Sequence, residues 1–151
     1  MKRTTITRAL LVAGLVGFGV LVACSRTPAP GAAAKANALP WGHDLTTALA
    51  TAESQNKVVM VDLYADWCVW CHRLDETTYA DTDVQSALKS VVLVKLNADQ
   101  GAGRALFSKY RIDGLPTVMF FNGRGKEVGR ITGYLPPGPF LAELRHILQR
   151  A

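Results

Sequence analysis

The most informative stretch of the chain is Val58-Val59-Met60-Val61-Asp62-Leu63-Tyr64-Ala65-Asp66-Trp67-Cys68-Val69-Trp70-Cys71. The apolar run 58–64 predicts a buried strand, and two cysteines separated by two residues fall where that strand turns into a helix. Aligned peptide dipoles place partial positive charge at the start of a helix, and this charge stabilises a thiolate on Cys68. A thiolate is the form that attacks a disulfide, and Cys71 is spaced to resolve the mixed disulfide. The pattern therefore predicts a redox-active dithiol.

The rest of the chain predicts an α/β fold built around this junction. Helices are expected over residues 45–55, 68–77, 102–110 and 139–149, with a short helical turn over 81–88, and strands over 58–64, 91–97, 117–121 and 127–132. This order predicts a mixed central sheet of four to five strands with helices on both faces. We expect the apolar strands 58–64 and 91–97 at its centre, because strands buried on both faces lose their polar alternation.

The first 23 residues have the pattern of an export signal. A positively charged start precedes an apolar stretch over 9–23, which at about 1.5 Å per residue covers only about 22 Å of a hydrocarbon core of about 30 Å. Leu21-Val22-Ala23-Cys24 resembles the lipobox of bacterial lipoproteins, which implies a lipid on Cys24; an ordinary cleavage site beside an incidental cysteine is the alternative. We expect a signal peptide at 1–23, a lipidated cysteine and flexible tether at 24–40, and a domain at 41–151.

Charge and cysteine content narrow the function classes. The signal carries three positive charges, so the formal net charge falls from +5 to +2 once it is removed. No basic run with interleaved aromatic residues is present, so a nucleic-acid partner is not expected. Of the three cysteines, lipidation takes Cys24 and leaves Cys68 and Cys71 as each other's partners. We expect a monomer without cofactor or metal.

Three ordered motifs resemble the thioredoxin superfamily over residues 41–148. They are Val61-Asp62-Leu63-Tyr64-Ala65-Asp66-Trp67-Cys68, Lys95-Leu96-Asn97-Ala98-Asp99 and Gly114-Leu115-Pro116-Thr117. Within the superfamily the chain looks most similar to the C-terminal periplasmic domain of the transmembrane thiol:disulfide interchange protein, which carries reducing equivalents outward. The resemblance implies a thioredoxin fold, a cis-proline at Pro116 that lies against the dithiol, and a substrate contact shaped by Leu115.

The cysteines and the acids take different expected roles. Cys68 is the attacking and exposed thiol, and Cys71 is the buried resolving thiol. Asp62 is an acid in an apolar strand, and burial raises the pKa of such a carboxyl. The resemblance implies that Asp62 exchanges the proton of Cys71 through water and that Lys95 pairs with it; a strand-end acid that reaches solvent is the alternative. Asp75, four residues after Cys71, is a second acid near the thiols or a solvated side chain.

The flanking residues differ from those of thioredoxin itself. Trp67 is expected to pack beside the site and shield it, although a core aromatic has the same signature. Trp70 is expected to be exposed as a substrate contact. Val69 and Trp70 replace the Gly-Pro of thioredoxin, and His72 replaces a lysine. Because these positions tune the thiolate, the redox potential of a relative does not carry over.

The sequence predicts a periplasmic thiol:disulfide oxidoreductase that is anchored by lipid on Cys24 and reduces disulfides of exported proteins. A membrane electron-donor thiol carrier would recharge it. Ser25 favours the outer membrane over the inner one. A thiol oxidase or isomerase is the alternative within the same chemistry. Two alternatives involve no thiol exchange. One is a c-type haem protein, because Cys68, Cys71 and His72 fit the C-x-x-C-H attachment pattern. The other is a non-catalytic thioredoxin-like scaffold. A zinc site has too few ligands.

Overall fold

The computed structural model describes residues 39–151 of the chain. The expected signal peptide, the expected lipidation site Cys24 and almost all of the expected tether lie outside the described residues. Within residues 39–151, no helix is both long enough and apolar enough to cross a membrane.

Helices and strands follow one another in the expected order. The helices are α2 (Leu45–Gln55), α3 (Val69–Arg73), the π-helix η1 (Leu74–Thr78), α4 (Thr82–Leu88), α5 (Gly101–Lys109) and α6 (Pro137–Leu148), and the strands are β1 (Val59–Tyr64), β2 (Val92–Asn97), β3 (Thr117–Phe121) and β4 (Glu127–Thr132). Aspartates cap the N-termini of two helices. Their side-chain oxygens accept hydrogen bonds from backbone N–H groups of the first turn. Asp44 caps α2 through Thr47 N at 2.6 Å, and Asp81 caps α4 through Val84 N at 3.0 Å.

The expected helix 68–77 is divided between α3 and η1. The hydroxyl of Thr77 donates to the carbonyl of Arg73 at 2.7 Å across the junction of the two helices. The next turn is wider, and Tyr79 N donates to the carbonyl oxygen of Leu74, five residues earlier. The π-helical turn carries Asp75, one of the predicted acids, on this wider register.

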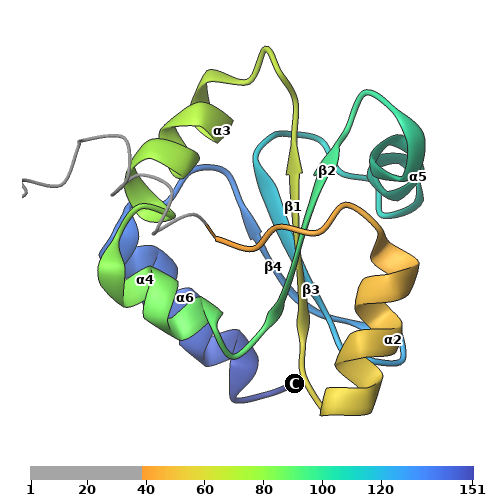
Figure 1. Ribbon diagram of the computed structural model, residues 1–151. Helices are drawn as coiled ribbons and strands as arrows, with labels where there is room; N and C mark the ends of the chain where they lie inside the picture. The colour runs from red at the N-terminus through yellow and green to blue at the C-terminus, as the bar shows by residue number, and fades with distance from the viewer. Residues whose placement is uncertain (1–38) are drawn as a thin grey trace, which may run out of the picture.

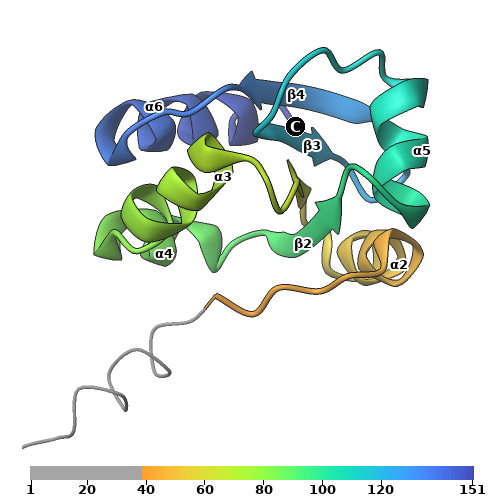
Figure 2. The same ribbon diagram turned by 90° about the horizontal axis from the view of Figure 1, so that it is seen from above.

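The described strands form one four-stranded mixed sheet in the order β2-β1-β3-β4. β1 runs parallel to β2 and antiparallel to β3, and β3 pairs antiparallel with β4. Helices α3, α4 and α6 cover one face, and α2 and α5 cover the other (Figure 1). Figure 2 shows the same two helical layers from above. The predicted α/β class and the helices on both faces are confirmed.

Two apolar clusters fill the space between the sheet and its helical layers. Met60 and Phe120 belong to the cluster under α4 and α6, and Met119 and Phe121 to the one under α2 and α5. These four side chains are fully or almost fully buried, with at most 2% exposed, which confirms their expected place in the core. The alternation along β3 sends neighbouring residues to opposite faces.

The prediction that strand 91–97 lies at the centre of the sheet is wrong. β2 is an edge strand, and the central positions belong to β1 and β3. The apolar run of β2 arises because helices cover both of its faces, although only one of its edges pairs with a full strand. Its outer edge is partly closed by an isolated parallel bridge between Gly42 and Val94. Lateral pairing and facial burial are separate properties, and the apolar pattern reports only the second.

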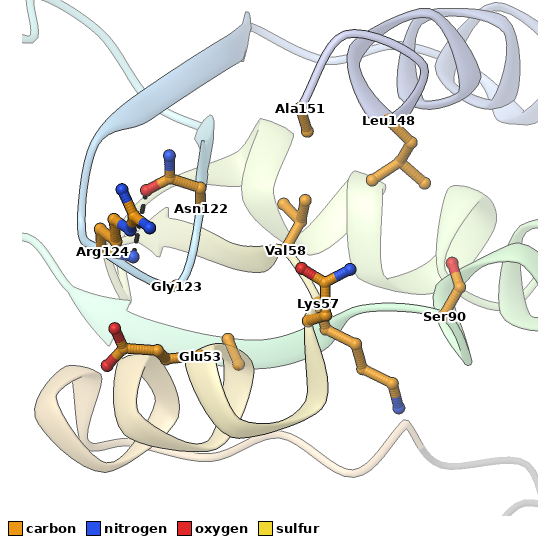
Figure 3. A pocket seen from close by; sticks show the side chains of 11 residues that line it. Glu53, Lys57, Val58, Ser90, Asn122, Gly123, Arg124, Leu148 and Ala151 are labelled. Atoms are coloured by element: carbon orange, nitrogen blue, oxygen red, sulfur yellow. Dashed lines mark hydrogen bonds between the residues drawn. The ribbon is translucent and has the colours of Figure 1, made fainter.

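A hollow lies at the end of β1 opposite the two cysteines. It is a pocket of about 580 Å³ between the end of α2, the β3–β4 turn and the C-terminus (Figure 3). Lys57 and Val58 line it at the start of β1, and Asn122 and Arg124 line it from the turn. Its lining contains no cysteine or histidine, so the predicted chemistry lies elsewhere.

Candidate active site

The two cysteines form a disulfide at the point where β1 passes into α3. Cys68 is the N-cap of α3, and Cys71 lies one turn further along the helix. The backbone N–H of Cys71 donates to the Sγ atom of Cys68, with 3.1 Å between nitrogen and sulfur. A helix-terminal N–H group directed at this sulfur stabilises negative charge on it once the disulfide is opened. The predicted dithiol is therefore in place.

The expectation that Cys68 is exposed is wrong for this disulfide form. Cys68 is 4% exposed and Cys71 is 2% exposed, and both belong to a small apolar cluster with Ala65. Tyr64 and Leu115 pack against this cluster. Bonding between the two sulfurs and packing from both sides remove the sulfurs from solvent, which the sequence position of Cys68 does not reveal.

A proline loop meets the disulfide from the start of β3. The peptide bond between Leu115 and Pro116 is cis, in agreement with the resemblance. Leu115 is partly buried against the cysteine cluster, and Pro116 is buried. The carbonyl of Pro116 accepts a hydrogen bond from Gly133 N at 2.8 Å, which ties the loop to the end of β4.

Three large apolar side chains stand out from the surface around the buried disulfide. Trp67 is 69% exposed, Val69 is 75% exposed and Trp70 is 59% exposed. Trp70 confirms its expected exposure and stacks on Tyr134, with ring centroids 5.6 Å apart. Trp67 is not a core aromatic: its Nε1 donates to Asp99 Oδ2 at 2.8 Å. Exposed apolar groups of this size are typical of surfaces that contact another chain.

A buried ion pair joins the two parallel strands next to the site. Asp62 and Lys95 are register partners on β1 and β2, and Lys95 Nζ lies 3.0 Å from Asp62 Oδ2. Asp62 is 1% exposed, so the alternative of a strand-end acid in solvent is wrong. Lys95 also donates to Asp75 Oδ1 from η1, which places the second predicted acid on the same ammonium group. The second oxygen of Asp62, Oδ1, is buried without a hydrogen-bond partner.

Burial sets the protonation of this cluster. Desolvation raises the pKa of Asp62 from 3.8 to about 6, against the opposing pull of Lys95, and the charge of Asp75 adds to the rise. For Lys95, burial alone lowers the pKa, but the two carboxylates outweigh it and leave the pKa above 10.5. Asp62 therefore changes protonation close to neutral pH while Lys95 stays charged. A carboxyl with such a pKa can exchange protons with a thiol.

Aromatic rings surround the ammonium group of Lys95. Its Nζ lies 5.3 Å from the ring centroid of Trp41, 5.2 Å from that of Tyr64 and 5.6 Å from that of Tyr79. A cation within about 6 Å of an aromatic face is attracted by the ring quadrupole. No motif predicted a role at the site for any of these three residues. Trp41, Tyr64 and Tyr79 are far apart in the chain, and only the fold brings their rings around Lys95.

Side-chain hydrogen bonds fasten the loop before Cys68 to the end of β2. Asn97 Nδ2 donates to Asp66 Oδ2 at 3.3 Å, beside the contact between Trp67 and Asp99. His72 Nε2 lies 2.9 Å from the carbonyl oxygen of Asp66, so the histidine of the C-x-x-C-H pattern contacts this loop from α3. Asp99 belongs to the motif 95–99, which by itself predicted no role for it. Its hydrogen bond with Trp67 is evident only from the folded structure.

The comparisons with known proteins agree with this architecture. Residues 45–148 match the family of thioredoxin-like domains. The chain is 41% identical over 109 residues to the thiol:disulfide interchange protein DsbD of Pseudoalteromonas atlantica, an alignment that covers 70% of this chain. It is 42% identical over 100 residues to DsbD of Escherichia coli, which covers 64% of this chain. Each alignment spans 18% of the relative, so the chain corresponds to a small part of DsbD.

Solved structures give the same result. A thioredoxin from Thermus thermophilus superposes with a TM-score of 0.62 at 31% identity, over 70% of this chain and 84% of that one. The C-terminal domain of Neisseria meningitidis DsbD in its oxidised form shares the fold, with a TM-score of 0.61 at 23% identity, over 74% of this chain and 99% of that domain. The chain therefore belongs to the thioredoxin-like domain family and is a homologue of the C-terminal domain of DsbD.

Proposed function

We propose that this thioredoxin-like disulfide oxidoreductase works as a reductase, which opens disulfides of exported proteins by dithiol exchange at Cys68 and Cys71. The observation that carries the proposal is the cysteine pair at the start of α3, with Cys71 N donating to Cys68 Sγ. The similarity to DsbD, a thiol:disulfide interchange protein, supports the same chemistry. The alternatives of a c-type haem protein and of a non-catalytic scaffold lose their support, because the family match and the bonded cysteine pair both favour thiol exchange.

The reaction moves two electrons from the dithiol to the target. In the reduced protein the Cys68 thiolate attacks one sulfur of the target disulfide, and the other target sulfur leaves as a thiolate. Cys71 then loses its proton and attacks the Cys68 sulfur of this mixed disulfide. The second target thiolate leaves, and the Cys68–Cys71 disulfide forms. A membrane thiol carrier that donates two electrons by the same exchange returns the pair to the dithiol.

The neighbouring groups have separate roles in this proposal. Asp62, with its pKa of about 6, takes the proton of Cys71 and returns it when the dithiol is restored. Lys95 stabilises the ionised form of Asp62, and Asp75, which accepts a hydrogen bond from the same ammonium group, opposes it. Leu115, Trp67 and Trp70 contact the bound chain beside the disulfide. Pro116 presents the loop at which that chain would lie.

The proposed location is the periplasmic side of a membrane. The export-signal pattern at 1–23 and the lipobox-like Leu21-Val22-Ala23-Cys24 support a lipid on Cys24, and Ser25 favours the outer membrane. One diacyl group and one further acyl chain on a single cysteine give stable anchoring where one chain does not. Metabolic labelling with a radioactive fatty acid tests this step, and Cys24→Ser must remove the label. Labelling that persists in the variant would refute the anchor.

A reductase assay with cysteine variants tests the chemistry. The wild-type protein, recharged by a small dithiol, is expected to reduce insulin, while Cys68→Ser abolishes turnover. Cys71→Ser is expected to accumulate a mixed disulfide between Cys68 and the target, visible on a non-reducing gel and absent from Cys68→Ser. Cys24→Ser is the matched control, because it removes a cysteine outside the pair and leaves turnover unchanged. Equal activity of Cys68→Ser and wild type would favour the scaffold reading.

The redox potential of the cysteine pair decides the direction of the exchange. Equilibration with glutathione buffers is expected to give a potential in the range of glutaredoxins and thioredoxin, roughly −200 to −270 mV. A value near about −120 mV, where strong oxidants lie, would instead make the protein a thiol oxidase.

A further inference from the structure

The short segment before α2 reaches the buried ion pair. Trp41 lies over Lys95, with 5.3 Å between Nζ and the ring centroid, and its ring also packs on Tyr79 at a centroid distance of 5.2 Å. Trp41 precedes residue 45, where the match to the thioredoxin-like family begins. A residue outside the matched part of the chain therefore contacts the cation that pairs with Asp62.

Backbone hydrogen bonds on both sides of Val94, the residue before Lys95, fix the position of this segment. Gly42 N donates to the carbonyl of Leu93 at 2.9 Å, and Lys95 N donates to the carbonyl of Gly42 at 2.9 Å. The next residue adds a side-chain contact, since His43 Nδ1 lies 3.0 Å from the carbonyl oxygen of Lys95. The strand-like bridge to β2 therefore holds the backbone next to Trp41 in place and positions its ring over Lys95.

The ammonium group of Lys95 lies within ion-pair distance of two carboxylates, those of Asp62 and Asp75. Asp62 is 1% exposed, whereas the side chain of Asp75 is 40% exposed and faces solvent. A solvated lysine would favour the exposed carboxylate, because that position keeps more water around the ammonium group. The rings of Trp41, Tyr64 and Tyr79 replace this water with an attractive apolar wall, and Lys95 retains a side-chain exposure of only 13%.

We propose that Trp41 is a positioning residue that holds the Lys95 ammonium group on Asp62, and that it thereby sets how readily Asp62 exchanges the proton of Cys71. The inference deepens the proposed function, since it rests on the role given there to Asp62. The segment 39–43 before α2 is then part of the redox site, because it holds Trp41 against Lys95.

The sign of the effect follows from the groups around Asp62. Lys95 from β2 favours the ionised carboxyl, and Asp75 from η1 disfavours it. Tyr64 and Tyr79 face the ammonium group with their rings, and His43 contacts the backbone of β2. The aromatic contact of Trp41 is with Lys95. Loss of the indole therefore weakens the favourable partner, and the protonation midpoint of Asp62 moves upward.

An NMR titration of the Asp62 carboxyl carbon measures this midpoint directly. The protein is the full-length chain, oxidised so that no thiol titrates, and labelled with ¹³C at aspartate. Trp41→Leu keeps an apolar side chain but removes the ring, and we expect an upward shift of about half a pH unit, ~3-fold in the protonation equilibrium. Trp41→Phe restores a ring and is expected to return most of the shift. Trp70→Leu is the matched control, since it makes the same replacement at an indole stacked on Tyr134, and it should not move the midpoint.

The role is refuted if Trp41→Leu titrates at the wild-type midpoint, or if Trp70→Leu shifts it equally. Circular dichroism and thermal unfolding show whether each variant is folded. Should Trp41→Leu fail to fold, Trp41→Met decides, because it also keeps an apolar side chain without a ring; a midpoint equal to that of wild type in this variant would overturn the proposal. A second variant, Lys95→Met, must make the midpoint insensitive to the ring at position 41. The titration needs no target protein, so a wrong reductase assignment with an intact shift is distinguishable from a wrong role for Trp41.

Discussion

Replacement of Asp62 by asparagine removes the buried charge next to the redox site while keeping the size of the side chain. Burial raises the pKa of Asp62 from 3.8 to about 6, so the folded protein binds the proton more tightly than the unfolded chain does. Stability from this group is fully present below pH 3.8 and is lost as the pH rises through about 6. A difference of roughly two pKa units corresponds to about 3 kcal/mol of unfolding free energy.

We therefore expect the free energy of unfolding of oxidised Asp62→Asn, relative to that of wild type, to be higher at pH 8 than at pH 4. Urea unfolding of wild type and variant at several pH values between 4 and 8 measures the difference. At pH 4 the two proteins differ by a constant offset, because protonated aspartate and asparagine are both neutral. Between pH 4 and 8 the difference should move by about 2.5 kcal/mol in favour of the variant, because part of the change lies below pH 4. A difference that stays flat, or moves toward the wild type, would refute the buried-charge reasoning.

Three further substitutions test packing, capping and the exposed surface. Gly103→Ala should lower the free energy of unfolding in urea by about 1–3 kcal/mol, because the added carbon would lie 2.0 Å from the carbonyl oxygen of Asn97. Gly114→Ala is the control: its added carbon meets nothing within 4 Å, so it should unfold like wild type. Asp81→Ala should cost about 1 kcal/mol through the lost cap of α4, and thermal denaturation with no change would argue against that cap. Trp70→Ala should raise KM for a protein disulfide several-fold without altering urea unfolding, since the indole is 59% exposed; an unchanged KM would remove it from the contact surface.

Local patterns in the sequence predicted the elements well. The aspartate caps of α2 and α4 and the strands on either side of the Asn122–Gly125 turn depend on neighbours only a few residues apart. The expected helix 68–77 is present, but its second half is π-helical, a register that the apolar periodicity did not predict. The central place given to strand 91–97 was wrong. Apolar composition reports how many faces are covered, and it carries no information about the strand on either side.

The candidate site divides in the same way. The sequence by itself determined the dithiol, because two cysteines at this spacing after a buried strand carry their chemistry in residue type and position. The resemblance to the thioredoxin superfamily supplied the cis-proline and the pairing of Asp62 with Lys95. Only the tertiary structure decided that the disulfide is buried, that Trp67 is anchored by Asp99 and that Trp41 reaches Lys95. These contacts join residues that are 32 and 54 positions apart in the chain. Their formation depends on how β2 is placed between β1 and the N-terminal segment, and no local pattern encodes that placement.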